Sequence, residues 1–176
     1  MKKTVKLKTP LVDRIIKSLR AGDEVKLSGV IYTARDRAHK KLAGLLTANK
    51  TLPLDIKNAV IYYCGPTFCK GKLGSCGPTT ASRMDNFLKP LAKAGLRATI
   101  GKGKRSYAVR EIIKKHRGVY FVTYAGCAAY LSNFIKSYKA AAFPELGPEA
   151  IYEFNVVDFP LIVGIDAYGE DIYSDI

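Results

Sequence analysis

Residues 59–91 read AVIYYCGPTFCKGKLGSCGPTTASRMDNFLKPL, and this stretch decides the fold. Its first five residues are a continuous apolar run of β-forming residues, typical of a strand buried on both faces. A glycine-rich loop is expected from residue 65 to residue 77. A helix should then begin near Pro78, with an apolar side made of Met84, Phe87, Leu88 and Leu91. Pro90 lies within that apolar side and should kink or shorten the helix.

The order of strand, loop and helix recurs on both sides of this stretch. Before it, the pattern predicts a strand at 25–33 and a helix at 34–46. After it, the pattern predicts a strand at 97–100, a helix at 107–115, a strand at 119–124, a short helix at 126–131, and two strands joined by turns at 151–154 and 161–165. The alternation predicts one α/β domain over residues 1–176, a mixed sheet with flanking helices and extra strands at both ends.

The composition is that of an ordinary globular chain. Of 176 residues, 48% are hydrophobic and 25% are charged, which excludes wholesale disorder. No segment reaches the ~18 uninterrupted apolar residues of a membrane span. The basic start at residues 1–8 is not followed by the apolar stretch of a secretory signal, so we expect a cytoplasmic protein.

The net charge of +14 is unevenly distributed along the chain. Residues 1–139 hold all 29 Lys and Arg, whereas residues 140–176 hold eight of the 15 acids. Such a chain could bind nucleic acid, membrane phosphates, a small anion or an acidic partner. Charge alone therefore does not choose among these partners.

The cysteines do not form a recognisable metal motif. Cys64, Cys69 and Cys76 are spaced C-x4-C-x6-C, with no C-x2-C pair and no nearby histidine, unlike zinc ribbons and bacterial ferredoxins. We expect these three and Cys127 to be free thiols in a reducing cytoplasm. A Cys64–Cys69 or Cys69–Cys76 disulfide is the less favoured alternative.

The segment CGPTTASR at 76–83 suggests an anion site. Thr79, Thr80 and Ser82 place hydroxyl groups around a helix N-terminus, where free N–H groups and the helix dipole attract anions. Arg83 follows one turn later and can bind a carboxylate or a phosphate through two hydrogen bonds. On this segment alone, a capped helix with one surface arginine is an equally good interpretation.

Two further strand ends carry a cation. Lys102 stands between two glycines in GKGKRS (101–106), and Arg35 precedes the helix in TARDRAH (33–39), where Asp36 can cap or orient it. For Lys104 and Arg105 we expect a solvated basic turn, and for His39 a packed or capping role. Ligands of α/β sheets gather at the carboxyl ends of strands, so three clustered cations favour a small dianion over a nucleic-acid track.

Five segments together resemble the β subunit of class I fumarase: SGVIYTARDRAHKKL (28–42), YYCGP (62–66), CGPTTASRMDNF (76–87), GKGKRS (101–106) and FPELGPEAIYEFNVVDFPLIVGID (143–166). The resemblance runs in order from about residue 10 to the end, and the segment 67–75 departs most from the family pattern. The same module resembles the C-terminal domain of single-chain class I fumarases and the β subunit of L(+)-tartrate dehydratase. The block at 143–151 is closer to fumarase.

The resemblance implies a swivelling β/β/α fold and a hydro-lyase that interconverts fumarate and water with (S)-malate, a reaction of the tricarboxylic acid cycle. It implies a 4Fe-4S cluster held by three cysteines of an α subunit, so this chain would hold no metal and be inactive alone. It also implies a hetero-oligomer such as α2β2, with a dicarboxylate substrate and neither nucleic acid nor membrane as partner.

By motif match, the resemblance also implies the site residues. Arg35 in T-A-R-D, Arg83 in G-P-T-T-x-x-R and Lys102 in G-K-G would bind the dicarboxylate, and Thr79 in G-P-T-T would assist proton transfer. An unaided threonine is too weak a base, so Thr79 would need activation, for example by a carboxylate of the α subunit. Lys102 is the alternative base.

Two alternatives to a fumarase remain open. One is the β subunit of L(+)-tartrate dehydratase or of another hydro-lyase acting on 2-hydroxy diacids, which would use the same four residues. The other belongs to a different class, a basic RNA-binding or regulatory module, whose complexes would weaken steeply as salt rises.

Overall fold

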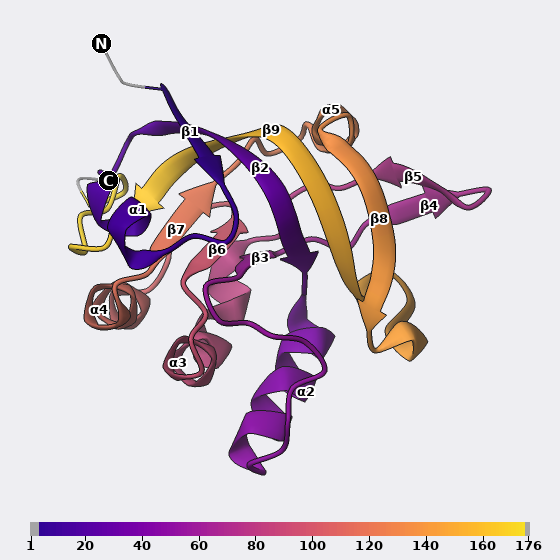
Figure 1. Ribbon diagram of the computed structural model, residues 1–176, viewed down its shortest axis with the longest axis horizontal. Helices are drawn as coiled ribbons and strands as arrows, with labels where there is room; N and C mark the ends of the chain where they lie inside the picture. Colours follow the sequence, from indigo (N-terminus) through magenta and orange to yellow (C-terminus); the bar gives the residue numbers. More distant parts are fainter. Residues whose placement is uncertain (1–3, 175–176) are drawn as a thin grey trace.

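The computed structural model describes residues 4–174, and its main feature is one curved sheet (Figure 1). The sheet has seven strands in the order β1-β2-β3-β6-β7-β9-β8, and β2 also pairs with β9. This extra pairing closes β2, β3, β6, β7 and β9 into a barrel-like ring, with β1 and β8 attached outside it. The strand bounds are β1 Thr4–Lys8, β2 Glu24–Thr33, β3 Val60–Tyr62, β6 Ala98–Gly101, β7 Val119–Val122, β8 Ile135–Ala142 and β9 Ile151–Ile165.

The strand directions bring several carboxyl ends to one edge of the sheet. β2, β3, β6 and β7 are successively parallel, whereas β9 runs antiparallel to β2 and to β7. The segments that follow β2, β3 and β6 therefore leave the sheet at the same edge. These are the segments that carry the predicted site residues.

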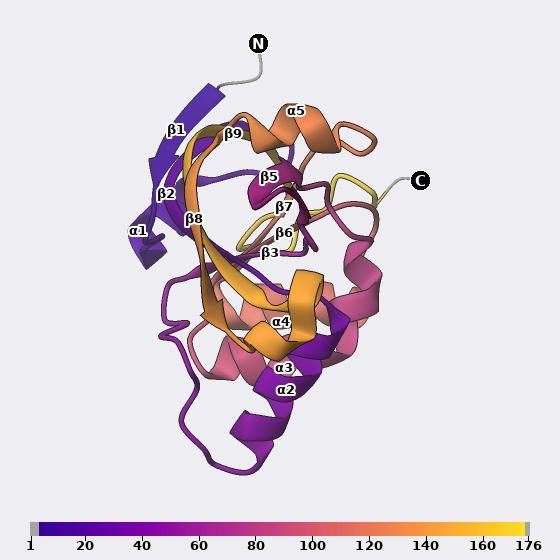
Figure 2. The same cartoon turned by 90° about the vertical axis from the view of Figure 1, so that its right-hand side faces the viewer.

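Three helices cover one side of the ring. α2 (Asp36–Thr47), α3 (Asp85–Lys93) and α4 (Tyr107–His116) lie next to one another below the curved sheet (Figures 1 and 2). The remaining helical pieces are short: α1 (Asp13–Ser18), α5 (Ala128–Ser132) and the 3-10 turns η1 (Ala81–Met84) and η2 (Pro144–Glu149). The fold is therefore a mixed α/β domain with flanking helices, in agreement with the predicted class.

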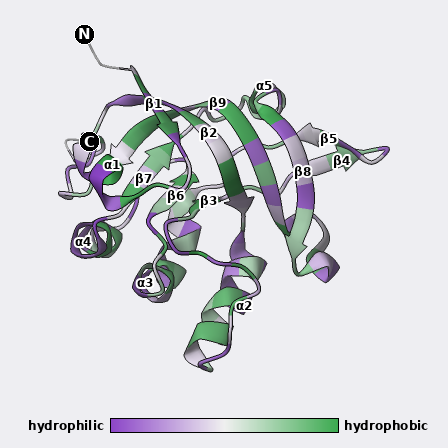
Figure 3. Ribbon diagram, viewed as in Figure 1, coloured by the Kyte–Doolittle hydropathy of each residue, from purple (hydrophilic) through white to green (hydrophobic). Residues whose placement is uncertain are grey.

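Three of the ring strands, β3, β6 and β7, are buried on both faces, as the apolar run at 59–63 predicted for β3. In β3, Val60 and Tyr62 belong to one apolar cluster, while Ile61 and the following Tyr63 belong to a second cluster shared with α2, α3 and α4. Side chains alternate across a strand, so one set fills the ring and the other set packs under the helices. β8 instead has exposed polar residues, which Figure 3 shows as hydrophilic segments.

Most of the predicted strands and helices are present, within one to three residues of the expected bounds at most ends. The extra strands at the two ends are also confirmed, although β1, α1 and β8 were not located from the sequence. Of residues 4–174, no helix is long and apolar enough to cross a membrane.

The expected loop at 65–77 is partly wrong, because it contains a two-stranded hairpin. β4 (Thr67–Cys69) pairs antiparallel with β5 (Lys72–Ser75). Phe68 packs against Tyr138 and Tyr152, with ring centroids 5.4 and 5.1 Å away. The hairpin therefore rests on β8 and β9, a long-range contact that the glycine-rich composition did not reveal.

The helix expected to begin near Pro78 begins later, at Asp85, after the turn η1. The amide of Ala81 donates to the carbonyl of Lys102, and Thr80 forms a parallel bridge with Lys102. This bridge to the end of β6 holds Thr80 outside any helical conformation, so no helix can run through it from Pro78. Pro90 lies inside α3, which continues to Lys93.

The two strands expected at 151–154 and 161–165 are a single strand, β9, and the predicted turns between them are wrong. Its pairing with β2 continues past a shift in register between Leu27 and Gly29. Asp158 has a positive φ of 52° at this irregularity. The polar and proline residues that suggested turns thus belong to a bulged strand that closes the ring.

Candidate functional site

Backbone hydrogen bonds place Thr79 beside Lys102. The amide of Thr79 donates to the carbonyl of Tyr63 at 2.6 Å, directly after β3. The amide of Lys102 donates to the carbonyl of Thr79 at 3.2 Å, and the amide of Ala81 donates to the carbonyl of Lys102 at 2.9 Å. The segment from Thr79 to Ala81 is therefore fixed along the chain that leaves β6.

The two predicted arginines are brought together around Asp36. Arg83 binds this carboxylate through two hydrogen bonds, Nε to Oδ1 at 3.1 Å and Nη2 to Oδ2 at 2.8 Å. Arg35 Nε lies 3.9 Å from Asp36 Oδ2. We expected Asp36 to cap or orient Arg35, but its carboxylate binds Arg83 more closely than it binds Arg35.

Arg35 lies against the loop that follows β3. A Cβ atom on Gly65 would stand 2.9 Å from both Cδ and Nη1 of Arg35, and 3.3 Å from the carbonyl oxygen of Pro148. A side chain at position 65 would therefore displace the Arg35 side chain from its present position. Gly65 belongs to the segment YYCGP, and nothing in the local sequence indicates this contact.

The four predicted residues and Asp36 lie at one edge of the sheet and form a partly exposed, positively charged group, which we call the cluster. The side chains of Arg35, Asp36 and Arg83 are 28%, 32% and 50% exposed, and Thr79 and Lys102 are half-buried. Three cations and one carboxylate leave a net charge of +2. Fixed positive charge at a partly exposed site can attract a small anion.

His39 is packed, as predicted. It is 1% exposed, and its Nδ1 lies 2.9 Å from the carbonyl oxygen of Arg35. Its ring contacts Tyr63 edge-on, with centroids 5.2 Å apart, and lies 6.0 Å from Phe87. Burial lowers the pKa of His39 from 6.5 to about 4, so the imidazole is neutral at pH 7.

We expect this histidine to make stability depend on pH. In the unfolded chain His39 binds a proton with a pKa near 6.5, whereas in the folded chain its pKa is about 4. The free energy of unfolding therefore falls as the pH decreases between these two values. Between pH 6.5 and 5 the free energy of unfolding should drop by about 1.5 kcal/mol from His39. Urea denaturation at both pH values would show a smaller drop in His39→Gln, whereas His116→Gln should retain most of it. An equal drop in His39→Gln would assign the effect to another group.

The expectation of a solvated basic turn is wrong for Arg105. Lys104 is exposed, but Arg105 is only 4% exposed and its guanidinium contacts Asp85 and two tyrosines. The local sequence GKGKRS gives no sign of this burial. The carboxylate that receives Arg105 comes from α3, 20 residues earlier.

The four cysteines are free, which agrees with the expectation of thiols and gives no support to either disulfide. Cys64 and Cys76 are buried, and burial raises the pKa of Cys76 to about 12 and that of Cys64 well above its usual value. Cys69 and Cys127 are exposed. Within residues 4–174 no group of His, Cys, Asp or Glu could hold a metal ion, so these residues do not fit an iron–sulfur cluster.

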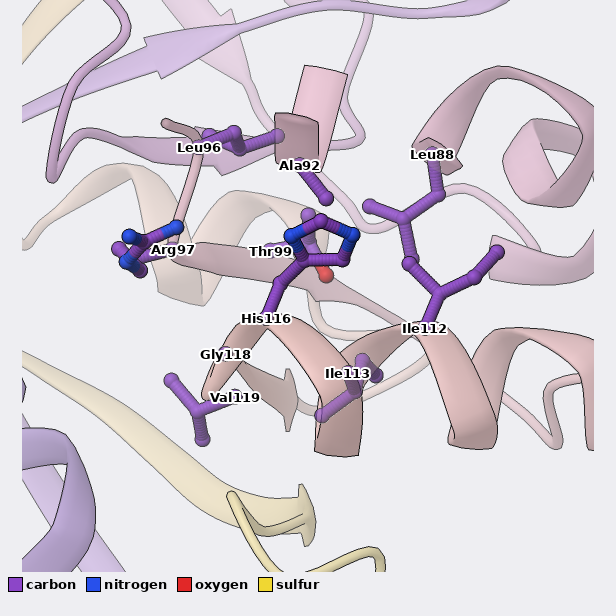
Figure 4. Close-up of a pocket in the computed structure, with 10 residues that line it drawn as sticks. All are labelled: Leu88, Ala92, Leu96, Arg97, Thr99, Ile112, Ile113, His116, Gly118 and Val119. Atoms are coloured by element: carbon purple, nitrogen blue, oxygen red, sulfur yellow. The ribbon is translucent and has the colours of Figure 1, made fainter. Parts of the chain in front are cut away.

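A hollow lies between α3, α4 and the strands β6 and β7 (Figure 4). It is mostly apolar and includes none of the predicted site residues. Desolvation, together with nearby Lys115, Arg97 and Lys93, lowers the pKa of His116, which lines it. A neutral histidine over leucine and isoleucine side chains indicates packing between helices.

Comparison with known proteins identifies similar chains. The family model described as "Fumarase C-terminus" matches residues 1–176. A class I anaerobic fumarate hydratase of Escherichia coli is 42% identical over 156 residues, which cover 86% of this chain and 28% of that protein. Fumarate hydratase 2 of Leishmania major is 39% identical over 97% of this chain and 31% of its own length.

A protein named as the beta subunit of L(+)-tartrate dehydratase, from Methanocaldococcus jannaschii, is 38% identical over 94% of this chain and 89% of its own length. The chain thus spans about a third of the fumarate hydratases it matches, but nearly all of this separate subunit.

Proposed function

Because the chain belongs to the fumarase C-terminal family, we propose that it is the β subunit of a class I fumarate hydratase, which reversibly hydrates fumarate to (S)-malate in the tricarboxylic acid cycle. Its partner would be an α subunit that carries the 4Fe-4S cluster.

The observation that carries this proposal is the cluster at the carboxyl ends of β2, β3 and β6. Arg35, Arg83 and Lys102 would bind the two carboxylates of the substrate. Their three positive charges and the one negative charge of Asp36 leave a net charge of +2, which matches a dianion. Thr79, hydrogen-bonded through its backbone to Lys102, would transfer the proton at the carbon atom next to a carboxylate. Lys102 is the alternative base, because an unaided hydroxyl binds a proton too weakly.

The assembly is proposed on the same grounds. The length match to a separate beta subunit supports assembly with an α subunit, and we propose a hetero-oligomer such as α2β2. The closed ring with helices on one side is compatible with a swivelling β/β/α domain, and we propose that residues 1–176 form this single domain. The four free cysteines fit a reducing compartment such as the cytoplasm.

L(+)-tartrate dehydratase is the second candidate, and the match over 89% of a named beta subunit favours it. Both substrates are dicarboxylates, so the same three cations could bind either. The substrates differ in hydroxyl groups, whose recognition would depend on residues of both subunits.

Reconstitution tests the proposal. The chain mixed anaerobically with its α subunit should convert fumarate and malate into each other, and the absorbance of fumarate measures this conversion. Each subunit alone should be inactive. If tartrate is dehydrated much faster than malate, the second candidate is correct. An assembled, iron-loaded complex that acts on none of these diacids would refute the proposed function.

A further inference from the structure

A buried ion pair holds the turn that carries Lys102. Arg105 Nε donates to Asp85 Oδ1 at 2.6 Å, with the arginine side chain fully buried and that of Asp85 13% exposed. The other oxygen of Asp85 accepts a hydrogen bond from the amide of Ser106 at 2.9 Å. Asp85 is the first residue of α3, so one carboxylate ties α3 to the turn before α4.

Two tyrosine rings enclose the guanidinium. Arg105 Cζ lies 5.3 Å from the ring centroid of Tyr63 and 5.1 Å from that of Tyr120, both within cation–π range. Arg105 Nη1 donates to the hydroxyl of Tyr63 at 3.5 Å. The hydroxyl of Tyr120 donates to the carbonyl of Gly103 at 2.8 Å. This hydrogen bond also restrains Gly103, the residue that follows Lys102.

Tyr63 connects this group with the site. Its carbonyl accepts the amide hydrogen of Thr79, and its ring would lie 2.9 Å from a Cβ on Gly101, immediately before Lys102. The same tyrosine therefore contacts the buried arginine, the chain at Thr79 and the strand end that leads to Lys102. A shift of the Arg105 side chain would therefore change the positions of both Thr79 and Lys102.

A buried charge pair is a costly way to gain stability, because desolvation offsets much of the attraction between the charges. We propose that Arg105 is a positioning residue which, through Asp85 and the two tyrosines, holds Lys102 beside Thr79 in the geometry that proton transfer needs. This inference rests on the proposed function for its catalytic consequence. Its structural part concerns the chain alone.

Amide hydrogen exchange on the full chain tests the structural part without any enzymatic assay. Arg105→Lys keeps the charge but loses the planar geometry that reaches both Asp85 and Tyr63. The amides of Lys102 and Ser106 should then exchange about tenfold faster or more, through local opening of the turn. The Phe121 amide, in the centre of β7, should be unchanged. The control Lys41→Met removes one member of the exposed Lys41–Glu145 pair and should alter none of these rates.

Kinetics of the assembled enzyme test the catalytic part. Arg105→Lys should lower kcat by about ten- to a hundredfold, the effect of a small misplacement of a reacting group. The same change made in a Lys102→Met background should lower kcat much less, because the residue it positions is already gone. A merely structural arginine would lower kcat by the same factor in both backgrounds.

A milder variant keeps the inference testable if Arg105→Lys fails to fold. Tyr120→Phe removes only the hydroxyl that fastens Gly103 and retains the ring beside the arginine. It should speed exchange at Lys102 and lower kcat in the same direction. Unchanged exchange at Lys102 in both variants, or equal acceleration at Phe121, would overturn the proposal even in an active enzyme. An inactive wild-type complex would instead count against the proposed function.

Discussion

Phe159→Ala should lower the free energy of unfolding by about 3–5 kcal/mol, the usual cost of emptying a fully buried aromatic site. Phe159 lies in β9 opposite Leu27 of β2, at the pairing that closes the ring. It is 0% exposed, and its ring lies 5.4 Å from that of Tyr62 and 6.2 Å from that of Phe134. The substitution would leave a cavity inside the ring that these rigid neighbours cannot fill.

Urea denaturation followed by circular dichroism measures this loss. Val157→Ala is the matched control, because Val157 stands two residues earlier in β9 and is 44% exposed. A surface substitution of this kind should change stability by about 0.5 kcal/mol or less. A loss below about 1 kcal/mol for Phe159→Ala would contradict a ring packed around this residue.

The sequence predicted the parts of the fold that depend on local pattern. The continuous apolar run at 59–63 and the amphipathic pattern at 107–115 gave the right elements because burial itself sets those periods. The ring closure was missed, because it depends on the pairing of β2 with β9, more than 120 residues apart. The middle of β9 contains Asn155, Asp158 and Pro160, the residue types that also form turns, so composition alone favoured the wrong alternative.

Part of the arrangement of the candidate residues could also be predicted from the sequence, while their roles stay predictions. The sequence places the cations Arg35, Arg83 and Lys102 after predicted strands. Parallel pairing of β2, β3 and β6 brings the ends of these strands together at one edge of the sheet. The role of Gly65 could not be read, since it follows from the position of an arginine side chain 30 residues earlier. A buried Arg105 looks like any basic residue of a turn until its distant carboxylate is known.

The choice between Thr79 and Lys102 as base gives the largest expected effect on catalysis. Thr79→Val keeps the shape of the side chain and removes only the hydroxyl. If Thr79 transfers the proton, the rate of the assembled enzyme should fall by about 10² or more, while apparent substrate affinity changes much less. Thr47→Val is the matched control, since Thr47 is an exposed threonine at the end of α2, and the same substitution there should leave the rate unchanged.

Lys102 should behave differently if it only binds the substrate. Lys102→Ala would remove a charge that acts in both the ground state and the transition state, so binding and rate should both decline. Lys102→Met removes the charge while keeping most of the bulk, which separates the two contributions. The decisive measurement is deuterium exchange at the carbon-bound proton of malate, because it follows proton transfer without the complete reaction. If Thr79→Val exchanges that proton at the normal rate and Lys102→Met does not, the base is Lys102, and Thr79 serves to hold it in place.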